Sequence, residues 1–267
     1  CIPASGMWFA DVECEDSAVV PAGVPATLLV GDAVCTCTPL SGGNADGVGR
    51  YRLIGGRGGW GRSVPAAGYL DDAGVKVQTL AQDAATAVGE LLGGVPTTAR
   101  VGPHFARLTD SPASAVLHAV APRAWYVGLD GVTLLGLRPE AQYVGTAIVM
   151  SRESASRTVE LAFDGLGVGI GALVPGVRIG DAEAATDVEW IVEPTSCTVR
   201  VSTGPTAAAR MHAAFAKILD ALDPSRRYRG AFEFRVVQQA GERLHLQPAR
   251  SASGMPDLLN VHVRPGV

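Results

Sequence analysis

The clearest alternation of apolar and polar residues lies near the end of the chain. Residues 229–238, 243–247 and 259–263 each alternate between the two kinds, with Phe234 beside Arg235 as one example. A turn containing glycine separates the first two segments. Such a period of two predicts half-buried antiparallel strands, so we expect a three-stranded meander. A sheet of this kind must close on itself or be covered by other elements.

The same alternation predicts strands throughout the rest of the chain. They are expected over residues 7–15, 26–30, 33–40, 50–54, 124–127, 132–137, 142–151, 158–163, 188–193 and 196–202. The Gly/Asn/Asp-rich residues 41–49 predict a loop. Asp130 and Gly131 predict a hairpin turn between two of the strands.

Three segments instead repeat apolar residues at intervals of three and four, which predicts helices. The first covers residues 71–92 and ends at Gly93, the second begins at Ser111 and Pro112, and the third covers residues 205–222. The order of elements predicts an α+β, β-rich fold with two small antiparallel β-barrel-like regions joined by helices. The expected domains are residues 1–70 (barrel-like), 71–122 (a helical connector) and 123–267 (barrel-like, with the third helix inserted at about 205–222).

The composition indicates a sparsely charged surface. Charged residues make up 18% of the 267 residues, and hydrophobic residues make up 47%. The charged share is below the roughly 25% of average chains, which suits a subunit that buries surface against partners. A genome rich in G and C is the alternative explanation. The net charge of −4 gives no basic surface for nucleic acid.

We expect no membrane insertion. The longest apolar run, residues 166–177, is too short to span a bilayer and is interrupted by glycines and Pro175. The first residues lack the segments of a signal peptide. For Cys1, we favour removal of an initiator methionine over a lipid-bearing cysteine.

The cysteines and the glycine-rich segment predict structural roles. The five cysteines show no zinc-type spacing, and we interpret Cys35 and Cys37 as small buried residues on one face of a strand. Residues 55–62 lack the Gly-Lys-Ser/Thr end of a phosphate-binding loop. We interpret them as a tight corner, with Trp60 capping a core or an interface. We interpret the scattered tryptophans as single buried anchors rather than a carbohydrate platform.

The histidines and carboxylates offer three alternatives that we weigh and set aside. His245, His262 and Asp257 are together able to supply metal ligands if their strands pair, but exposed polar positions explain them more simply.

Asp71 and Asp72 are expected to cap the first helix rather than to form an acid–base pair. Asp164 and Asp181 have the residue types of a glycosidase pair, yet both adjoin glycine and are expected to lie in turns. We therefore predict no enzyme, and no catalytic, cofactor-binding or metal-binding residues.

Several segments resemble the baseplate or tail-tip hub proteins of tailed bacteriophages. The segments that carry the resemblance are residues 6–12, 28–32, 52–60, 125–131, 228–230, 244–248 and 254–258, together with the helices around Leu80 and His118. The match spans most of the chain, and its motifs consist mainly of glycine, tryptophan and strand patterning.

The resemblance implies a structural role in the phage tail. Hub proteins form a ring, usually three-fold, that joins the tail tube to the tip or spike. The implied partners are further copies of this chain, the tail-tube or distal tail protein, and a spike or tip protein. The implied location is the virion, with synthesis in the host cytoplasm. A chain of this length is expected to lack the cell-wall-cleaving domain of longer hub proteins. The alternatives are a β-rich module that binds a cell-surface polysaccharide or protein, and a hydrolase using Asp164 or Asp181.

Overall fold

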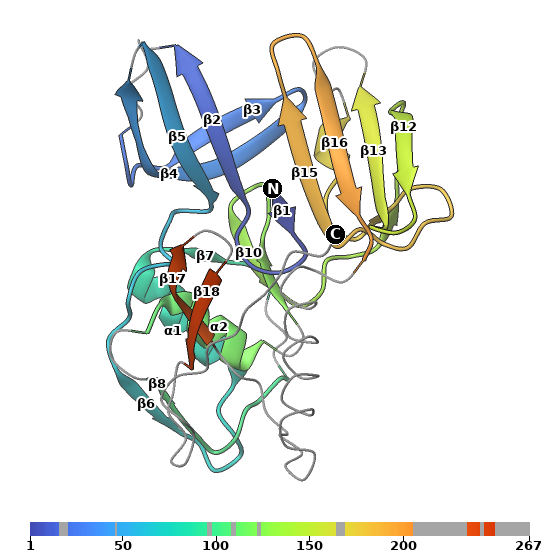
Figure 1. Ribbon diagram of the computed structural model, residues 1–267. Helices are drawn as coiled ribbons and strands as arrows, with labels where there is room; N and C mark the ends of the chain where they lie inside the picture. Colours follow the sequence, from blue (N-terminus) through green and yellow to red (C-terminus); the bar gives the residue numbers. More distant parts are fainter. Residues whose placement is uncertain are drawn as a thin grey trace. The chain divides into compact units, whose positions relative to one another are not determined.

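The computed structural model describes residues 1–15, 21–45, 47–94, 98–107, 111–121, 124–163, 169–204, 234–240 and 243–248 (Figure 1). The chain forms two compact units, Cys1–Arg210 and Met211–Val267. The described part of the first unit is rich in strands and contains two short α-helices. The predicted domain boundaries at residues 70 and 122 stay predictions.

The described part of the second unit is an antiparallel pair of strands. Strands β17 (Phe234–Ala240) and β18 (Arg243–Pro248) pair with Val236 opposite Leu246. This confirms two strands of the expected meander, although β17 extends through the start of the predicted turn. The expected strand at 259–263 and the expected helix at 205–222 lie outside the described residues.

The first sheet of the first unit is antiparallel and open. Its order is β2 (Phe9–Glu15), β5 (Val48–Gly55), β4 (Ala33–Ala45) and β3 (Ala26–Val30). Its two outer strands, β2 and β3, do not pair with each other, so these four strands do not close a barrel. Cys35, Cys37 and Leu53 point to the buried face, in agreement with the predicted alternation.

The loop predicted at residues 41–49 is wrong, because β4 continues to Ala45 and β5 begins at Val48. The glycines there serve packing rather than a turn. Gly42 lies directly opposite Tyr51, and a Cβ atom on Gly42 would overlap the Tyr51 ring. A Cβ on Gly49 would lie 2.9 Å from the same ring. An aromatic ring that covers neighbouring glycines, one on the opposite strand and one on its own, stabilises such strands.

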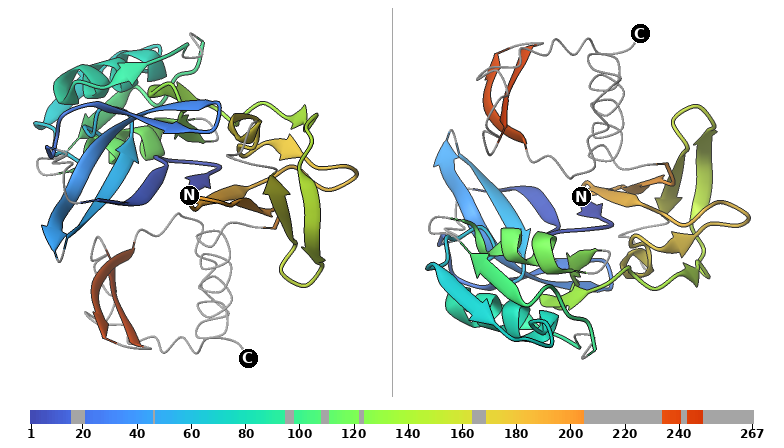
Figure 2. Two further views of the ribbon diagram at one scale, coloured as in Figure 1. Left: turned by 90° about the horizontal axis from the view of Figure 1, so that it is seen from above. Right: turned by 90° about the horizontal axis from the view of Figure 1, so that it is seen from below.

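The second sheet has five strands, with β12 at its outer edge (Figure 1), and Figure 2 shows the described strands from above and from below. Its order is β1 (Ile2–Pro3), β15 (Asp187–Val192), β16 (Cys197–Ser202), β13 (Thr158–Phe163) and β12 (Ile148–Glu153). The apolar residues of β13 and β16 form a continuous core with buried residues of the segment that follows β13, including Ile170 and Leu173. This segment contains the short 3-10 helix Ile170–Ala172 and strand β14 (Val177–Arg178).

The strand predicted at 142–151 is interrupted. Ala141–Gln142 forms β11, which pairs in parallel with β14, and the sheet strand begins only at Ile148. The Tyr143 ring lies against Gly145, so that a Cβ on this glycine would overlap it.

Both helices are shorter than predicted. Helix α1 spans Val77–Val88 and ends at Gly89 with a left-handed φ of +75°. It buries the predicted apolar stripe up to Val88, but Leu91, the last predicted member, lies outside the helix and is exposed. The prediction of 71–92 is wrong at both ends. Gly74 takes a φ of +90° before the helix, and Leu91–Leu92 forms strand β7 after it. Helix α2 spans Ala113–Val120 and, as expected, buries Val116, Leu117 and Val120; Pro112 rather than Ser111 occupies its N-cap position.

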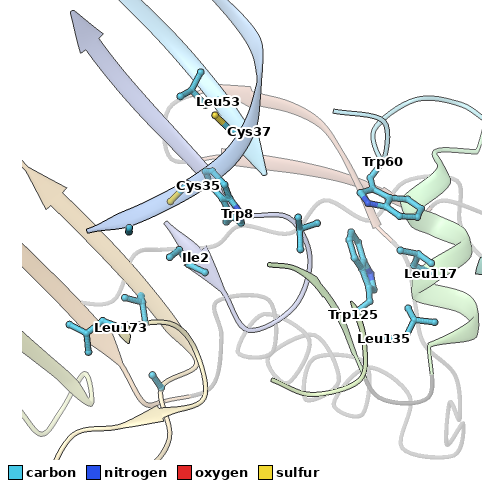
Figure 3. Packing of buried hydrophobic residues seen from close by; sticks show 14 of the residues in the cluster. Ile2, Trp8, Cys35, Cys37, Leu53, Trp60, Leu117, Trp125, Leu135 and Leu173 are labelled. Carbon is cyan, nitrogen blue, oxygen red and sulfur yellow. The ribbon is translucent and has the colours of Figure 1, made fainter. Parts of the chain in front are cut away.

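The middle of the first unit holds a three-stranded sheet and a separate two-stranded ribbon. Strands β9 (Trp125–Val127) and β10 (Val132–Leu135) form the hairpin predicted around Gly131, and β10 also pairs in parallel with β7. Strands β6 (Ala67–Leu70) and β8 (His104–Arg107) form a separate ribbon. Close to the hairpin, Trp60 and Trp125 pack beside Leu117 of α2 (Figure 3).

Candidate functional site

The glycine-rich residues 55–62 form a corner around a buried carboxylate. Glu90 accepts hydrogen bonds from the backbone N–H of Arg57 to Oε2 (3.0 Å) and of Gly59 to Oε1 (2.5 Å), and it is only 6% exposed. Gly56 takes a φ of +83°, which L side chains rarely adopt. The predicted tight corner is confirmed, and the Glu90 carboxylate already accepts hydrogen bonds from two of its backbone amides.

The tryptophans act as buried anchors, as predicted. Trp8, Trp60 and Trp125 are almost fully buried, and the ring centroids of Trp60 and Trp125 lie 5.8 Å apart. Each indole N–H donates a hydrogen bond: Trp8 to the carbonyl of Gly128 (3.1 Å), Trp60 to Oγ1 of Thr133 (2.8 Å), Trp125 to Nδ1 of His118 (3.3 Å) and Trp190 to the carbonyl of Leu173 (3.0 Å). These side chains therefore organise the core.

The structure assigns the singled-out carboxylates to turns where it describes them. Asp71 accepts a hydrogen bond from the N–H of Ala73 (3.0 Å) and pairs with Arg100 (3.3 Å). Because α1 begins only at Val77, the predicted capping role of Asp71 and its neighbour Asp72 is wrong. Asp181 is exposed in a turn, and Asp164 lies outside the described residues.

Two of the three residues considered and set aside as metal ligands lie outside the described residues. His245 belongs to β18, whereas Asp257 and His262 fall outside the described residues. Where the structure describes the chain, no group of three or more His, Cys, Asp or Glu side chains is placed to hold a metal ion. The described residues also contain no helix long and apolar enough to cross a membrane.

The cysteines have the character expected of small buried residues. All five are free thiols, and Cys35, Cys37 and Cys197 are buried. Burial raises the pKa of Cys35 to about 11 and also raises that of Cys37. At neutral pH both thiols are therefore protonated, which makes them poor nucleophiles and metal ligands.

A polar cluster anchors the β6–β8 ribbon to α1. The Tyr69 hydroxyl donates a hydrogen bond to Asp83 of α1, and Nη1 of Arg107 lies 2.9 Å from the same carboxylate. Arg107 also donates from Nε to the carbonyl of Pro65 (2.7 Å). Burial, followed by the hydrogen bond to Asp83, raises the pKa of Tyr69 to about 12. The cluster joins the β6–β8 ribbon to α1.

Strand β12 is an edge strand with apolar side chains facing solvent. It pairs with β13, and no other strand among the described residues pairs with its second side. Ile148, Val149 and Met150 are 61%, 41% and 63% exposed. The register shifts at Met150, which marks a β-bulge. Natural proteins usually cover or charge such edges, so this one is a candidate contact surface.

Strand β4 has a second open edge beyond the end of β3. The β3 pairing stops at Cys37, and Gly23 adds one hydrogen bond from its N–H to the carbonyl of Pro39 (2.8 Å). From Leu40 to Gly43, no described strand pairs with this side of β4. Leu40 is exposed, and a Cβ on Gly43 would have no atom within 4 Å. At Gly43 the backbone of this edge therefore has open space beside it.

The outer face of the first sheet beside this edge carries two cross-strand ion pairs. Arg52 donates to both carboxylate oxygens of Asp11 (2.7 Å each), and Nε of Arg50 donates to Glu13 (2.8 Å). The Arg52 hydrogen bond lowers the pKa of Asp11. Together with Ser41 and its neighbours, these side chains line a shallow depression of about 250 Å³. Because its charges are already paired with each other, the depression offers little to a ligand.

Sequence reasoning missed the residues that now stand out. The run Ile148-Val149-Met150 does not alternate, which is a signal that a strand is apolar on both faces. Glu90 is a lone acidic residue between Gly89 and Leu91, and nothing nearby in the sequence indicates the amides that it binds.

Comparison with known proteins adds no family to this picture. No protein-family model matches the chain, and no curated protein matches its sequence.

Proposed function

We propose that this protein is a structural subunit of a bacteriophage tail, a baseplate or tail-tip hub that forms a ring between the tail tube and the tip or spike. Its partners are further copies of itself, as a three-fold ring, and the tail proteins above and below. It acts in the virion after synthesis in the host cytoplasm. The proposal assigns it no enzymatic activity, nucleic-acid binding or membrane insertion.

The observation that carries the proposal is the exposure of apolar side chains at open sheet edges. Besides Ile148 and Met150 on β12, the directly opposite residues Leu29 and Val34 of β3 and β4 are 68% and 60% exposed. Apolar residues clustered on open sheets favour association, whereas singly scattered ones need no explanation. A ring in which neighbouring copies cover these edges accounts for them.

The proposal includes the finer fold expected from the sequence. It is an α+β arrangement with barrel-like regions at residues 1–70 and 123–267 and a helical connector at 71–122. In a hub ring, neighbouring copies complete barrels that a single copy leaves open. The open first sheet, with β2 and β3 unpaired to each other in the described residues, supports this idea.

The second candidate is a β-rich module that binds a cell-surface polysaccharide or protein. A polysaccharide platform requires exposed aromatic side chains. Among the described large hydrophobic residues that are exposed, Phe9 is the one aromatic, at 39%. The exposed aliphatic residues instead favour a protein partner, so the protein-binding form of this alternative is the one that competes with a hub.

Native mass spectrometry of the full chain tests the proposal. A hub predicts a discrete complex of three 27.5-kDa copies, or a multiple of three, across a concentration series. The purified ring is also expected to bind a phage tail-tube protein. A chain that stays monomeric at all concentrations and binds no tail protein contradicts the proposal. A monomer that binds a purified cell-surface protein supports the alternative.

A further inference from the structure

Two of the open edges in the described part of the first unit, strand β12 and residues 40–43 of β4, terminate complementary rows of side chains. Directly opposite residues in neighbouring antiparallel strands share a face and lie close together, so rows of interacting side chains run across a sheet. Both sheets present a charged row on one face and an apolar row on the other. Each of these rows stops at an open edge.

The charged row of the second sheet ends on a negative charge. It runs from Glu189 through Arg200 and Glu160 to Ser151 on β12. Arg200 lies 3.1 Å from Glu189, and the Ser151 hydroxyl donates to Glu160 (3.3 Å). The signs alternate along the row, and Glu160 is the last charge before the edge.

The charged row of the first sheet ends on a positive charge. It runs from Asp11 through Arg52 to Ser41 on β4. Arg52 is the last charge before the edge. Each edge thus presents a serine, backed by an acid in one sheet and by a base in the other.

The apolar rows match in the same register. In the second sheet the row is Trp190, Val199, Leu161 and Val149. In the first sheet it is Val12, Tyr51 and Gly42, where the Tyr51 ring covers the glycine. The exposed Val149 therefore has an apolar counterpart at the other edge.

We propose that β12 of one copy pairs antiparallel with residues 40–43 of β4 in the next copy. Ser151 then lies opposite Ser41, Val149 opposite Gly42 and Ile148 opposite Gly43, while Met150 remains the bulged residue. The charged row continues from Glu160 to Arg52 across the two serines. Ile148 covers the bare backbone of Gly43.

This contact is head-to-tail, because it joins two different edges. Such contacts propagate around a closed ring rather than stopping at a two-fold dimer. The inference rests on the proposed function, for which it supplies the contact between neighbours. Full-length pairing of β12 with itself is disfavoured, since antiparallel overlap would place Ile148 opposite Glu153.

Disulfide trapping between two variants, each with one introduced surface cysteine and the buried Cys35, Cys37 and Cys197 retained, tests the register. In a background in which Cys1 and Cys14 are replaced by serine, Ile148→Cys and Gly43→Cys chains are mixed and oxidised. Opposite residues of an antiparallel pair have Cα atoms about 4.5–5.5 Å apart, which a disulfide spans. We expect a covalent dimer in the mixture and none with either variant alone. Its absence from the mixture, or equal formation by Ile148→Cys alone, overturns the pairing.

A charge placed at the β12 edge tests the edge pairing separately from ring formation. Ile148→Lys puts an ammonium group beside Arg50 of the next copy, because Arg50 lies directly opposite Gly43. We expect the concentration at which the complex dissociates to rise about a hundredfold. The control is Leu70→Lys, because Leu70 is a comparably exposed apolar residue on β6. We expect this substitution to leave the dissociation concentration unchanged. A ring that persists in Ile148→Lys overturns the edge pairing alone, whereas a monomeric wild type overturns the ring and the pairing together.

Discussion

Replacing Glu90 tests whether its carboxylate holds the glycine-rich corner in place. Glu90→Ala removes both acceptors and leaves the amides of Arg57 and Gly59 buried without a partner. Glu90→Gln keeps the size and one acceptor oxygen, but its NH₂ group then faces a backbone donor. Both variants should therefore be less stable than the wild type, and Glu90→Ala should be the less stable of the two.

The magnitude follows from two hydrogen bonds to a charged acceptor. Each contributes about 1.5–3 kcal/mol to stability. Glu90 also lies just beyond the C-terminus of α1, where the helix dipole disfavours a negative charge by about 0.3–1 kcal/mol. The hydrogen bonds outweigh that cost, so we expect Glu90→Ala to lower the free energy of unfolding by about 3–4 kcal/mol. For Glu90→Gln, which loses one bond, we expect about 2 kcal/mol.

Urea unfolding of the full chain, followed by tryptophan fluorescence, measures these differences. Trp60 lies within the same loop and is buried, so its emission reports on the corner. The matched control is Arg57→Ala, which removes an exposed side chain but keeps the amide that binds Glu90. A Glu90→Ala midpoint that coincides with that of Arg57→Ala would refute the reasoning, because the carboxylate would then contribute nothing.

Three further predictions concern packing, a buried hydrogen bond and pH. Gly42→Ala should cost about 1–3 kcal/mol by chemical denaturation, because its Cβ would overlap the facing ring, whereas Gly43→Ala, with open space around it, should change stability by less than about 0.5 kcal/mol. Thr133→Val should cost about 1–3 kcal/mol in the same assay, since it leaves the buried Trp60 indole N–H (0% exposed) without its acceptor. Because the pKa of Tyr69 is raised from 10.0 to about 12 on folding, the unfolded chain loses this proton first, and stability should fall as pH rises from about 10 to 12. Allowing for solvent screening of the partly exposed ring, Tyr69→Phe should remove about 1 kcal/mol of that fall, and an unchanged slope between pH 9 and 12 would contradict the assignment.

Local patterning predicted much of the fold where a strand or helix buries one face. Residues 26–30 and 158–163 form strands with the predicted boundaries, and the hairpin at Gly131 forms as expected. In each case alternation or turn chemistry is visible within a few residues. The predicted apolar stripe of α1 is confirmed from Val77 to Val88, because burial decides the interior of a helix.

The failures arose where a residue far along the chain decides the conformation. Gly42 appeared to belong to a loop because nothing nearby shows that the Tyr51 ring covers it. The ends of α1 are an exception, since they are set locally by Gly74 and Gly89, whose positive φ values the sequence pattern did not reveal. The open edge at Ile148 depends on which strands are neighbours, and strand order is a property of the whole topology. For the same reason the amides that bind Glu90 were not foreseen.

The hydrogen bond between Trp8 and Gly128 bears on how the protein is made. Its partners are 120 residues apart, and the bond between Ser5 and Trp125 spans the same separation. At ribosomal rates of about 5–20 residues per second, Trp8 waits roughly 6–24 s for its acceptor. The first sheet is thus complete in sequence long before the hairpin that secures it emerges. During that interval its apolar face lacks cover, so a nascent chain arrested before residue 128 should bind chaperones that a chain arrested after β10 no longer needs.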